Sequence, residues 1–492
     1  MRELGAMLKT LIKKEITETI LDLRFVIATL LCVVLIPLGM YVSLKEYEQR
    51  LQTYQTSIQQ YQERSRDAIG YEFKAEGYRP PSPLSVFASG LKDILNLKVT
   101  ATNSGNPQIE SQTEGTNLQA ALFGRIDFVY IVSTVLSLLA FIFTFSAVTS
   151  EKETGTLRQM LSNSVPRSCI ILSKILGNYL VFLAPFILSL LLGLLILNAS
   201  TSFTLLSQGV FPAIVIILLI TLLFMFCNFC LGVLVSVLTH RSVVSMIVIL
   251  LVWAVCALIV PKISPRIAQI MYPIRSQLVV DVEKRMTIAS LQDELRSKRS
   301  ELLRSILDEK GIDFKEGDGN FDKAIEPAKE AYNQAKVTLE REYKERIATA
   351  LRQIENEYAN KRRVQGGIGV NLSRVSPICC FTYALSELAG TGTSEMDNFT
   401  TQAKQFQENV EHSIYNNIEV EVYQLGGHDQ WHIYDKDGFN SFDIQIPNLT
   451  DYQHTTLAQA LGVCWVDIVL LVLFSVLFFA GAFVSFLRYD VR

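Results

Sequence analysis

Six stretches of this sequence stay apolar for about 20 residues and hold almost no charge. They are residues 25–44, 126–148, 170–197, 210–238, 243–260 and 461–486. A helix of about 20 residues is long enough to cross the hydrocarbon core of a bilayer, where only helices and closed barrels satisfy their backbone hydrogen bonds. The pattern predicts a mainly α-helical membrane protein with six transmembrane helices.

Lysine and arginine in the short segments predict the orientation of these helices. Short segments that carry basic residues tend to stay in the cytoplasm. Basic residues precede the first stretch, occur in the connection 149–169 and between stretches four and five, and follow the sixth, whereas the connection 198–209 has none. We therefore expect both termini in the cytoplasm, and the long segments 45–125 and 263–458 outside it.

The larger outer segment, 263–458, is expected to be mostly helical. Two charged stretches, 276–309 and 323–363, have helical character, and the second repeats an apolar residue every three or four positions. The sequence between them, GIDFKEGDGNFD, is rich in turn-forming residues. These features predict an antiparallel helical hairpin over 276–363.

Three further segments outside the apolar stretches have a composition or pattern that predicts their structure. Residues 371–390 are apolar but too short to span, so we expect them to pack against the membrane or the core. The run IEVEVYQL within 417–447 alternates, which predicts a small β element. Residues 99–117 are rich in Ser, Thr, Asn and Gly, and we expect an irregular loop there.

The N-terminal segment, residues 1–24, carries apolar residues at helical spacing with basic residues on the polar side. This pattern predicts an amphipathic helix that lies in the cytoplasmic interface of the membrane. The alternative is an ordinary cytoplasmic segment that leads into the first span.

Several functional classes have no support in the sequence. It has no GxxxxGK[ST] phosphate-binding loop, no HExxH motif and no GxSxG motif, so we do not expect the chain to be an enzyme by itself. The net charge of −3 comes without a basic stripe, and we expect no nucleic-acid partner. The eight cysteines form no ligand framework, and no metal site is expected.

The connection between the second and third stretches carries the most specific motif, Ser150-Glu-Lys-Glu-Thr-Gly-Thr-Leu. Acidic residues suit the N-terminus of a short helix, and glycine allows a close backbone approach or an unusual φ. The leucine offers an apolar anchor. A charged turn without further role is the alternative.

This motif resembles the E-K-E-x-G-T-L coupling segment of ABC-2 permeases, the membrane subunits of ATP-driven exporters. In that family a short cytoplasmic helix docks into the nucleotide-binding subunit. The resemblance assigns this coupling role to Glu151, Lys152, Glu153, Gly155, Thr156 and Leu157. The segments KKEITETILDLRFVI, RPPSPLSVFASGL, NLSRVSPICCFTYALSELAGTG and FLRYDVR resemble other parts of a branch with a large outer domain.

The resemblance also implies partners and a location. It implies a bacterial cytoplasmic (inner) membrane, contact with membrane lipid, and a separate ABC ATPase subunit that holds ATP and Mg, whereas this chain binds no cofactor. It implies a dimer with a second copy or a paralogous permease, and a periplasmic partner is a further expectation. The function expected is that of a permease that moves a substrate outward.

Two other functions remain open at this point. One is an ATP-driven mechanical relay that acts on outer partners through the hairpin without transport. The other is a membrane-anchored structural or receptor protein without an ATPase.

Polar residues inside the apolar stretches are candidates for a substrate path, because such residues are costly in a membrane. Asn178 and Asn228 either line a path or form hydrogen bonds between helices. Asp467 is a path candidate that we expect to pair with an outer-end group such as Arg125. Lys174 lies near the cytoplasmic end of its stretch, and we expect it to extend to the interface.

Overall fold

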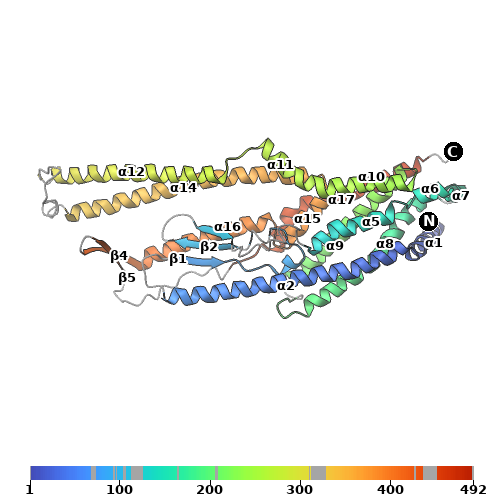
Figure 1. The fold of residues 1–492 in the computed structure, drawn as a ribbon, viewed down its shortest axis with the longest axis horizontal. Coiled ribbons are helices and arrows are strands. Elements are labelled where there is room, and N and C mark those ends of the chain that lie inside the picture. The colour runs from blue at the N-terminus through green and yellow to red at the C-terminus, as the bar shows by residue number, and fades with distance from the viewer. Residues whose placement is uncertain are drawn as a thin grey trace.

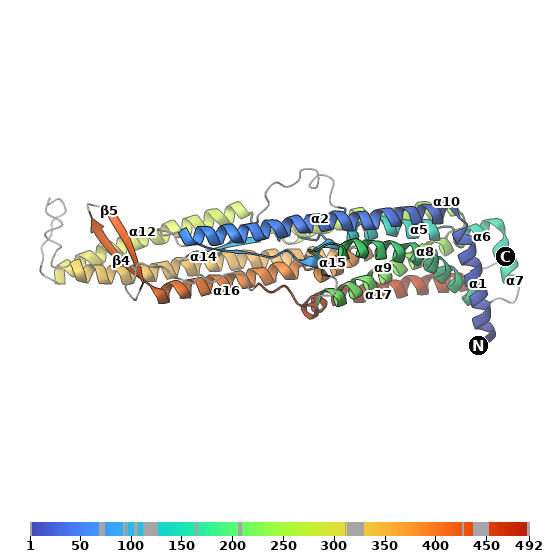
Figure 2. The ribbon, with the colours of Figure 1, turned by 90° about the horizontal axis from the view of Figure 1, so that it is seen from below.

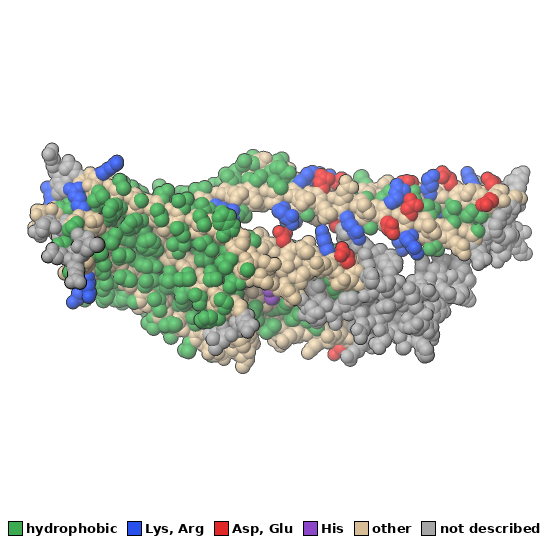
Figure 3. All heavy atoms as spheres, turned by 180° about the vertical axis from the view of Figure 1, so that it is seen from behind, with side chains coloured by type: hydrophobic (Ala, Val, Ile, Leu, Met, Phe, Trp, Pro, Cys, Tyr) green, Lys and Arg blue, Asp and Glu red, His purple; other side chains and the backbone are tan. Residues whose placement is uncertain are grey.

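The structure is a computed structural model of the 492-residue chain. It describes residues 2–67, 74–91, 95, 97–102, 107–111, 126–162, 166–204, 209–309, 311, 329–425, 428–435 and 452–489. The molecule is elongated, with a helical bundle at one end (Figure 1). At the other end lies a second domain, which we call the outer domain because the sequence predicts that it lies outside the membrane. Both termini lie at the bundle end. Figure 3 shows that apolar side chains cover the bundle, whereas Lys, Arg, Asp and Glu alternate along the outer domain.

Within the described residues, six helices are long and apolar enough to cross a membrane: Leu23–Glu63, Phe128–Thr154, Arg167–Asn198, Val210–Leu238, Ser242–Met271 and Leu457–Leu487. The elements that form them are α2 (Leu23–Asp67), α4 (Phe128–Tyr130) with η2 (Ile131–Leu136), α5 (Ser137–Thr144) and α6 (Thr149–Thr154), α8 (Arg167–Asn198), α9 (Val210–Leu238), α10 (Ser242–Ala254) with η3 (Val255–Ile259) and α11 (Val260–Met271), and α17 (Leu457–Leu487). The predicted six-helix membrane fold is confirmed. The orientation of the termini remains a prediction.

Side-chain caps explain where two of the spans begin. The Asp127 carboxylate accepts hydrogen bonds from the backbone N–H of Tyr130 at 2.7 Å and of Ser89 at 2.6 Å, so it starts the second span and ties it to the first outer segment. Thr456 and Gln459 form a reciprocal capping box at the start of α17.

A small antiparallel sheet lies in the first outer segment. Its strands are β1 (Lys74–Tyr78), β2 (Leu97–Thr102) and β3 (Gln108–Ser111), in that order, and η1 (Pro83–Val86) lies between the first two in sequence. Alternate residues of β2 pack against Phe399, Ala403, Phe406 and Val410 on α16 (Thr393–Asn417). The prediction of an irregular loop at 99–117 is wrong where β2 and β3 lie. Their apolar residues are few, and the burial that orders them comes from a helix about 300 residues away.

The predicted helical hairpin consists of α12 (Gln277–Glu309) and α14 (Lys329–Ser373), which run side by side in opposite directions (Figure 1). Leu302, Leu303, Ile306 and Leu307 pack with Tyr332 and Ala335 between the arms. The ion pairs Lys284–Glu355 and Arg299–Glu340 cross from arm to arm. The second arm continues past the predicted end at residue 363, and the predicted turn, apart from Gly311, lies outside the described residues.

The segment after the hairpin returns to the bundle as α15 (Pro377–Leu388). Nearly all of its residues are buried, and it packs against α9 and α17. Phe381 stacks on Phe224 of α9 with ring centroids 4.3 Å apart. This agrees with the expectation that 371–390 packs against the core. The strands β4 (Ile418–Leu425) and β5 (His428–Asp435), which follow α16, form the predicted small β element.

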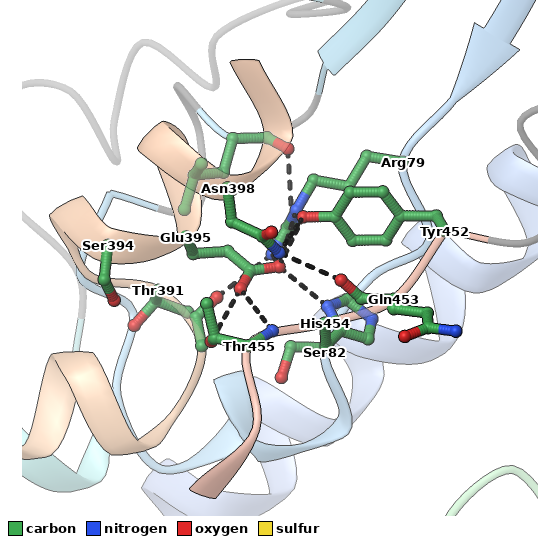
Figure 4. A network of polar contacts seen from close by, with 12 residues as sticks. Arg79, Ser82, Thr391, Ser394, Glu395, Asn398, Tyr452, Gln453, His454 and Thr455 are labelled. Carbon is green, nitrogen blue, oxygen red and sulfur yellow. Dashed lines mark hydrogen bonds and ion pairs between the residues drawn. The ribbon is translucent and has the colours of Figure 1, made fainter. Parts of the chain in front are cut away.

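A buried carboxylate joins the outer domain to the start of the last span (Figure 4). Glu395 on α16 contacts Arg79 Nη2 at 2.9 Å, the Tyr452 hydroxyl at 2.8 Å and His454 Nδ1 at 2.8 Å. It also accepts from the Thr455 hydroxyl, at 2.8 Å, directly before α17. Burial acts to raise the pKa of Glu395, but His454, Arg79 and the Thr455 N–H outweigh it and hold this pKa well below its ordinary value.

Candidate coupling site

The segment with the most specific motif forms two short helices, α6 (Thr149–Thr154) and α7 (Thr156–Ser162), at the bundle end beside both termini (Figure 2). Gly155 separates them with a φ of +75°, in the left-handed region that glycine adopts without strain. A Cβ at this position would meet nothing within 4 Å. The glycine is therefore needed for its backbone angle and not for a close approach.

Glu151 is tied to the third span. Its carboxylate accepts from Lys174 Nζ at 2.7 Å, and the same ammonium contacts Glu15 on the N-terminal helix at 3.1 Å. The Lys174 side chain is only 3% exposed. The expectation that Lys174 extends to the interface stays a prediction, and the structure adds that two carboxylates compensate its charge inside the protein.

Lys152 is tied to the end of the fourth span. Its ammonium donates to the backbone carbonyls of Val237 and, at 2.8 Å, of Thr239, and it lies over the Tyr489 ring, 4.7 Å from the centroid. Carbonyls at the C-terminus of a helix lack intrahelical donors and attract a cation. Lys152 therefore completes the end of α9.

Glu153 is tied to the start of the fifth span. Its carboxylate accepts from the backbone N–H of Ser242 at 2.8 Å and from the Ser242 hydroxyl at 2.9 Å. This places a negative charge at the N-terminus of α10, where the helix dipole favours it. Three consecutive charged residues thus connect one short segment to α8, α9 and α10.

Leu157 faces the interior. Its side chain is 2% exposed and packs in a cluster with Val148, Ile170, Ile171, Val237 and Phe486. The predicted apolar anchor therefore holds α7 on the bundle. The side chains of this segment that remain exposed, besides Glu153, are Ser150, Thr154, Thr156, Arg158, Gln159 and Ser162.

The N-terminal helix α1 (Arg2–Ile20) runs across the bundle end at a steep angle to the spans (Figure 2). It is seated on α8, where a Cβ on Gly177 would come within 2.7 Å of the Glu15 Cβ. Thr19 donates to the Asn178 side-chain oxygen at 3.1 Å. Gly177 and Asn178 lie three and four residues after Lys174 and so share one face of α8 with it.

The remaining intramembrane candidates lie apart from this site. The Asn228 side chain donates to the Phe224 carbonyl of its own helix at 2.8 Å. Asp467 accepts from Arg374 Nε at 2.7 Å and Nη2 at 2.9 Å, a bidentate pair with the residue that follows α14. Asp467 therefore pairs with an outer-end group, as expected, and this group is Arg374, whereas Arg125 lies outside the described residues.

Sequence reasoning missed Glu15, Ser242 and Arg374 as partners. A lysine inside an apolar stretch was the available signal, because a buried cation needs an anion nearby. Nothing in the local pattern identifies which carboxylate that is. Among the described residues, no group of three His, Cys, Asp or Glu side chains is placed to hold a metal ion.

Comparison with known proteins gives one match over nearly the whole chain. The model of a family described as ABC-2 family transporter protein matches residues 9–491. A comparison with curated proteins finds no match. Since the family model covers all six spans, the motif at residues 150–157 and the outer domain, the chain belongs to the ABC-2 transporter family.

Proposed function

We propose that the chain is the permease subunit of an ABC exporter, in which a separate ATPase subunit binds ATP and Mg and drives outward movement of a substrate. The observation that carries this proposal is the set of contacts made by Glu151, Lys152 and Glu153, which hold the third, fourth and fifth spans. A displacement of this one segment therefore reaches three spans together. The proposed setting is the bacterial cytoplasmic membrane, with the long segments outside.

The contacts divide the motif into two roles. The three charged residues and Leu157 engage the bundle, so they transmit movement. The ATPase subunit then docks on the exposed side chains around Gly155. Among those that the structure describes, Arg158 is the charged side chain without an ion pair or side-chain hydrogen bond to a span. Arg158 is suited to an acidic partner because guanidinium groups bind carboxylates in a bidentate manner.

The test separates docking from transmission. Arg158→Glu is expected to weaken docking by roughly tenfold or more, because it places like charges together at the interface. Arg488→Glu, at another exposed arginine of the bundle end, is the matched control. Glu153→Ala removes the contact with α10 but no docking group, so the ATPase should still co-purify.

The measurement is co-purification of the ATPase subunit, followed by ATPase activity of the reconstituted complex. If Arg158→Glu retains the ATPase and Glu153→Ala loses it, then the acidic residues dock and the division of roles is wrong. If all three variants behave as wild type, the segment has no coupling role.

A mechanical relay is the second candidate, and the attachment of the hairpin favours it. The first arm, α12, follows α11 at the end of the fifth span, whereas the second arm, α14, is tied by Arg374 to Asp467 in the sixth. Relative sliding of these spans would shift one arm along the other. Excising residues 295–344 and joining the shortened arms tests this, because a permease should keep ATP-driven export whereas a relay should lose its outer effect.

A further inference from the structure

The sixth span ends beside the coupling segment, which consists of α6 and α7 (Figure 2). Tyr489 follows the last residue of α17 by two positions, and the Lys152 ammonium of α6 lies 4.7 Å from the centroid of its ring. An ammonium over the face of an aromatic ring is attracted by the quadrupole of the ring. Because the same ammonium donates to carbonyls at the end of α9, Lys152 joins the coupling segment to both the fourth and the sixth span.

Arg167 makes a second contact with the end of the sixth span. It is the first residue of α8, and its Nη1 donates to the backbone carbonyls of Leu487 at 2.7 Å and of Tyr489 at 3.1 Å. A cation is unfavourable at the N-terminus of a helix and favourable at the C-terminus, where the last carbonyls lack intrahelical donors. The Arg167 guanidinium therefore stabilises the end of α17 and not its own helix. We call Lys152, Arg167 and Tyr489 the C-terminal clamp.

Apolar packing adds a third contact at the same place. Leu157 of α7 and Phe486 of α17 belong to one buried cluster, and they are 2% and 1% exposed. Phe483 and Tyr489 pack against this cluster. The end of the sixth span is thus held on the coupling segment and on the start of α8 by polar and apolar contacts together.

The sixth span is well suited to carry movement without bending. α17 has 31 residues of α-helix, is about 47 Å long and contains no proline. The second and fifth spans contain the π-helical turns η2 and η3, and Pro185 lies inside the third. Prolines and π-helical turns are the usual places at which a helix kinks. A displacement at the C-terminal clamp therefore reaches the other end of α17 with little loss.

The other end of α17 is tied to the outer domain at two points. Asp467 forms the bidentate ion pair with Arg374, the residue that follows α14 of the hairpin. The Thr455 hydroxyl, directly before α17, donates to Glu395 on α16 at 2.8 Å. Both carboxylates are almost fully buried, and salt screens buried charges much less than exposed ones. Hence α17 connects the coupling segment at one end with the hairpin and α16 at the other.

We propose that the C-terminal clamp makes the sixth span the element through which movement of the coupling segment reaches the outer domain. Its three members are positioning residues, because they act on α17 and not on a nucleotide or a substrate. The inference rests on the proposed function, since an ATPase has to displace the coupling segment. It goes beyond the contacts of the three charged motif residues, which reach the third, fourth and fifth spans, and it assigns a role to Tyr489 of the C-terminal FLRYDVR segment.

Four variants test the clamp. Tyr489→Leu keeps an apolar side chain but removes the ring face, whereas Tyr489→Phe keeps the ring and should behave as wild type. Arg167→Met keeps the apolar stem and removes the hydrogen-bond donors. Arg488→Gln is the matched control, since Arg488 is exposed next to Tyr489. All four should retain the ATPase subunit, because none of them changes Arg158, the proposed docking group.

The measurement is the distance between spin labels on Ser202→Cys, at the outer end of the third span, and Gln353→Cys, on the hairpin, in the purified complex with its ATPase. Both positions are exposed, whereas seven native cysteines are buried and Cys256 is partly buried. Addition of ATP and vanadate should shift this distance in the wild-type background. Tyr489→Leu and Arg167→Met should lose most of the shift while ATP hydrolysis continues, and Tyr489→Phe and Arg488→Gln should keep it.

The outcomes are distinct. Loss of the distance shift with continued ATP hydrolysis supports the inference, because a general folding defect would lower both. The inference is overturned if Tyr489→Leu and Arg167→Met keep the full shift, if Tyr489→Phe loses it, or if the wild-type background shows none. Loss of the ATPase from the Tyr489→Leu variant also overturns it, because Tyr489 would then be a docking residue. Failure of the unsubstituted chain to bind an ATPase would instead refute the proposed function and this inference with it.

Discussion

Lys174 is the point at which two short elements, α1 and α6, meet the third span. It holds Glu15 of α1 and Glu151 of α6 at the same time, so α1 and the coupling segment share one buried cation. Burying ions is costly, and removing one partner of such a cluster costs more than replacing the whole cluster by neutral groups. The arrangement therefore fixes how the two elements sit relative to each other.

Lys174→Met should destabilise the protein by about 3–5 kcal/mol, because it leaves two buried carboxylates unpaired. Adding Glu15→Gln and Glu151→Gln should recover most of this loss. Thermal unfolding of the purified complex in detergent is the measurement. A single variant as stable as wild type would mean that the cluster is not buried in the protein.

Glu395 makes the stability of the outer domain depend on pH. Its pKa is lower in the folded protein than its ordinary value of 4.5, so its contribution is complete above that pH and is lost as the pH falls below it. Glu395→Gln should cost about 2–4 kcal/mol at neutral pH, because Arg79 loses its anion. The difference between wild type and variant should shrink on acidification, as followed by thermal unfolding at pH 7 and pH 4. A constant difference would contradict this assignment.

At the scale of elements, the features that depend on residues close in sequence could be predicted. The features that depend on packing between distant segments could not. Hydropathy and helical periodicity identified the six membrane helices and the hairpin, because each depends on residues close in sequence. The sheet was missed, since β2 and β3 are ordered by α16. The motif at 151–157 was found from the sequence. The contacts of Leu157 and Glu153 could not be predicted, because they depend on how the spans pack against one another.

The far end of the hairpin offers a test of its packing. Leu307→Asp should destabilise this end by about 2–4 kcal/mol, because Leu307 is buried and a carboxylate there has no partner. Val337→Asp is the control, since Val337 is 55% exposed on the other arm. Limited proteolysis should cut α12 and α14 faster in the first variant only. Equal cleavage of both would show that the arms do not pack through this cluster.

At the scale of the whole molecule, the prediction concerns orientation. Cysteines at Ser202 and Gln353, which are exposed at the end of the third span and on the hairpin, should react with a membrane-impermeant thiol reagent added to intact cells. A cysteine at Gln159 should react only after the membrane is opened. Labelling of position 159 from outside would reverse the topology and move the coupling site to the wrong side for an ATPase.

The first span has a further consequence for how distant parts of the molecule move. It does not break at the membrane surface: α2 is one helix of 45 residues, about 68 Å long, and its outer part contacts η1 and β1. A rod of that length converts rotation into displacement. If its N-terminal end stays fixed, a tilt of about 10° carries the far end sideways by about 12 Å, which is about the width of a helix. A small change in the tilt of α2 within the bundle would therefore move the sheet sideways by a large distance.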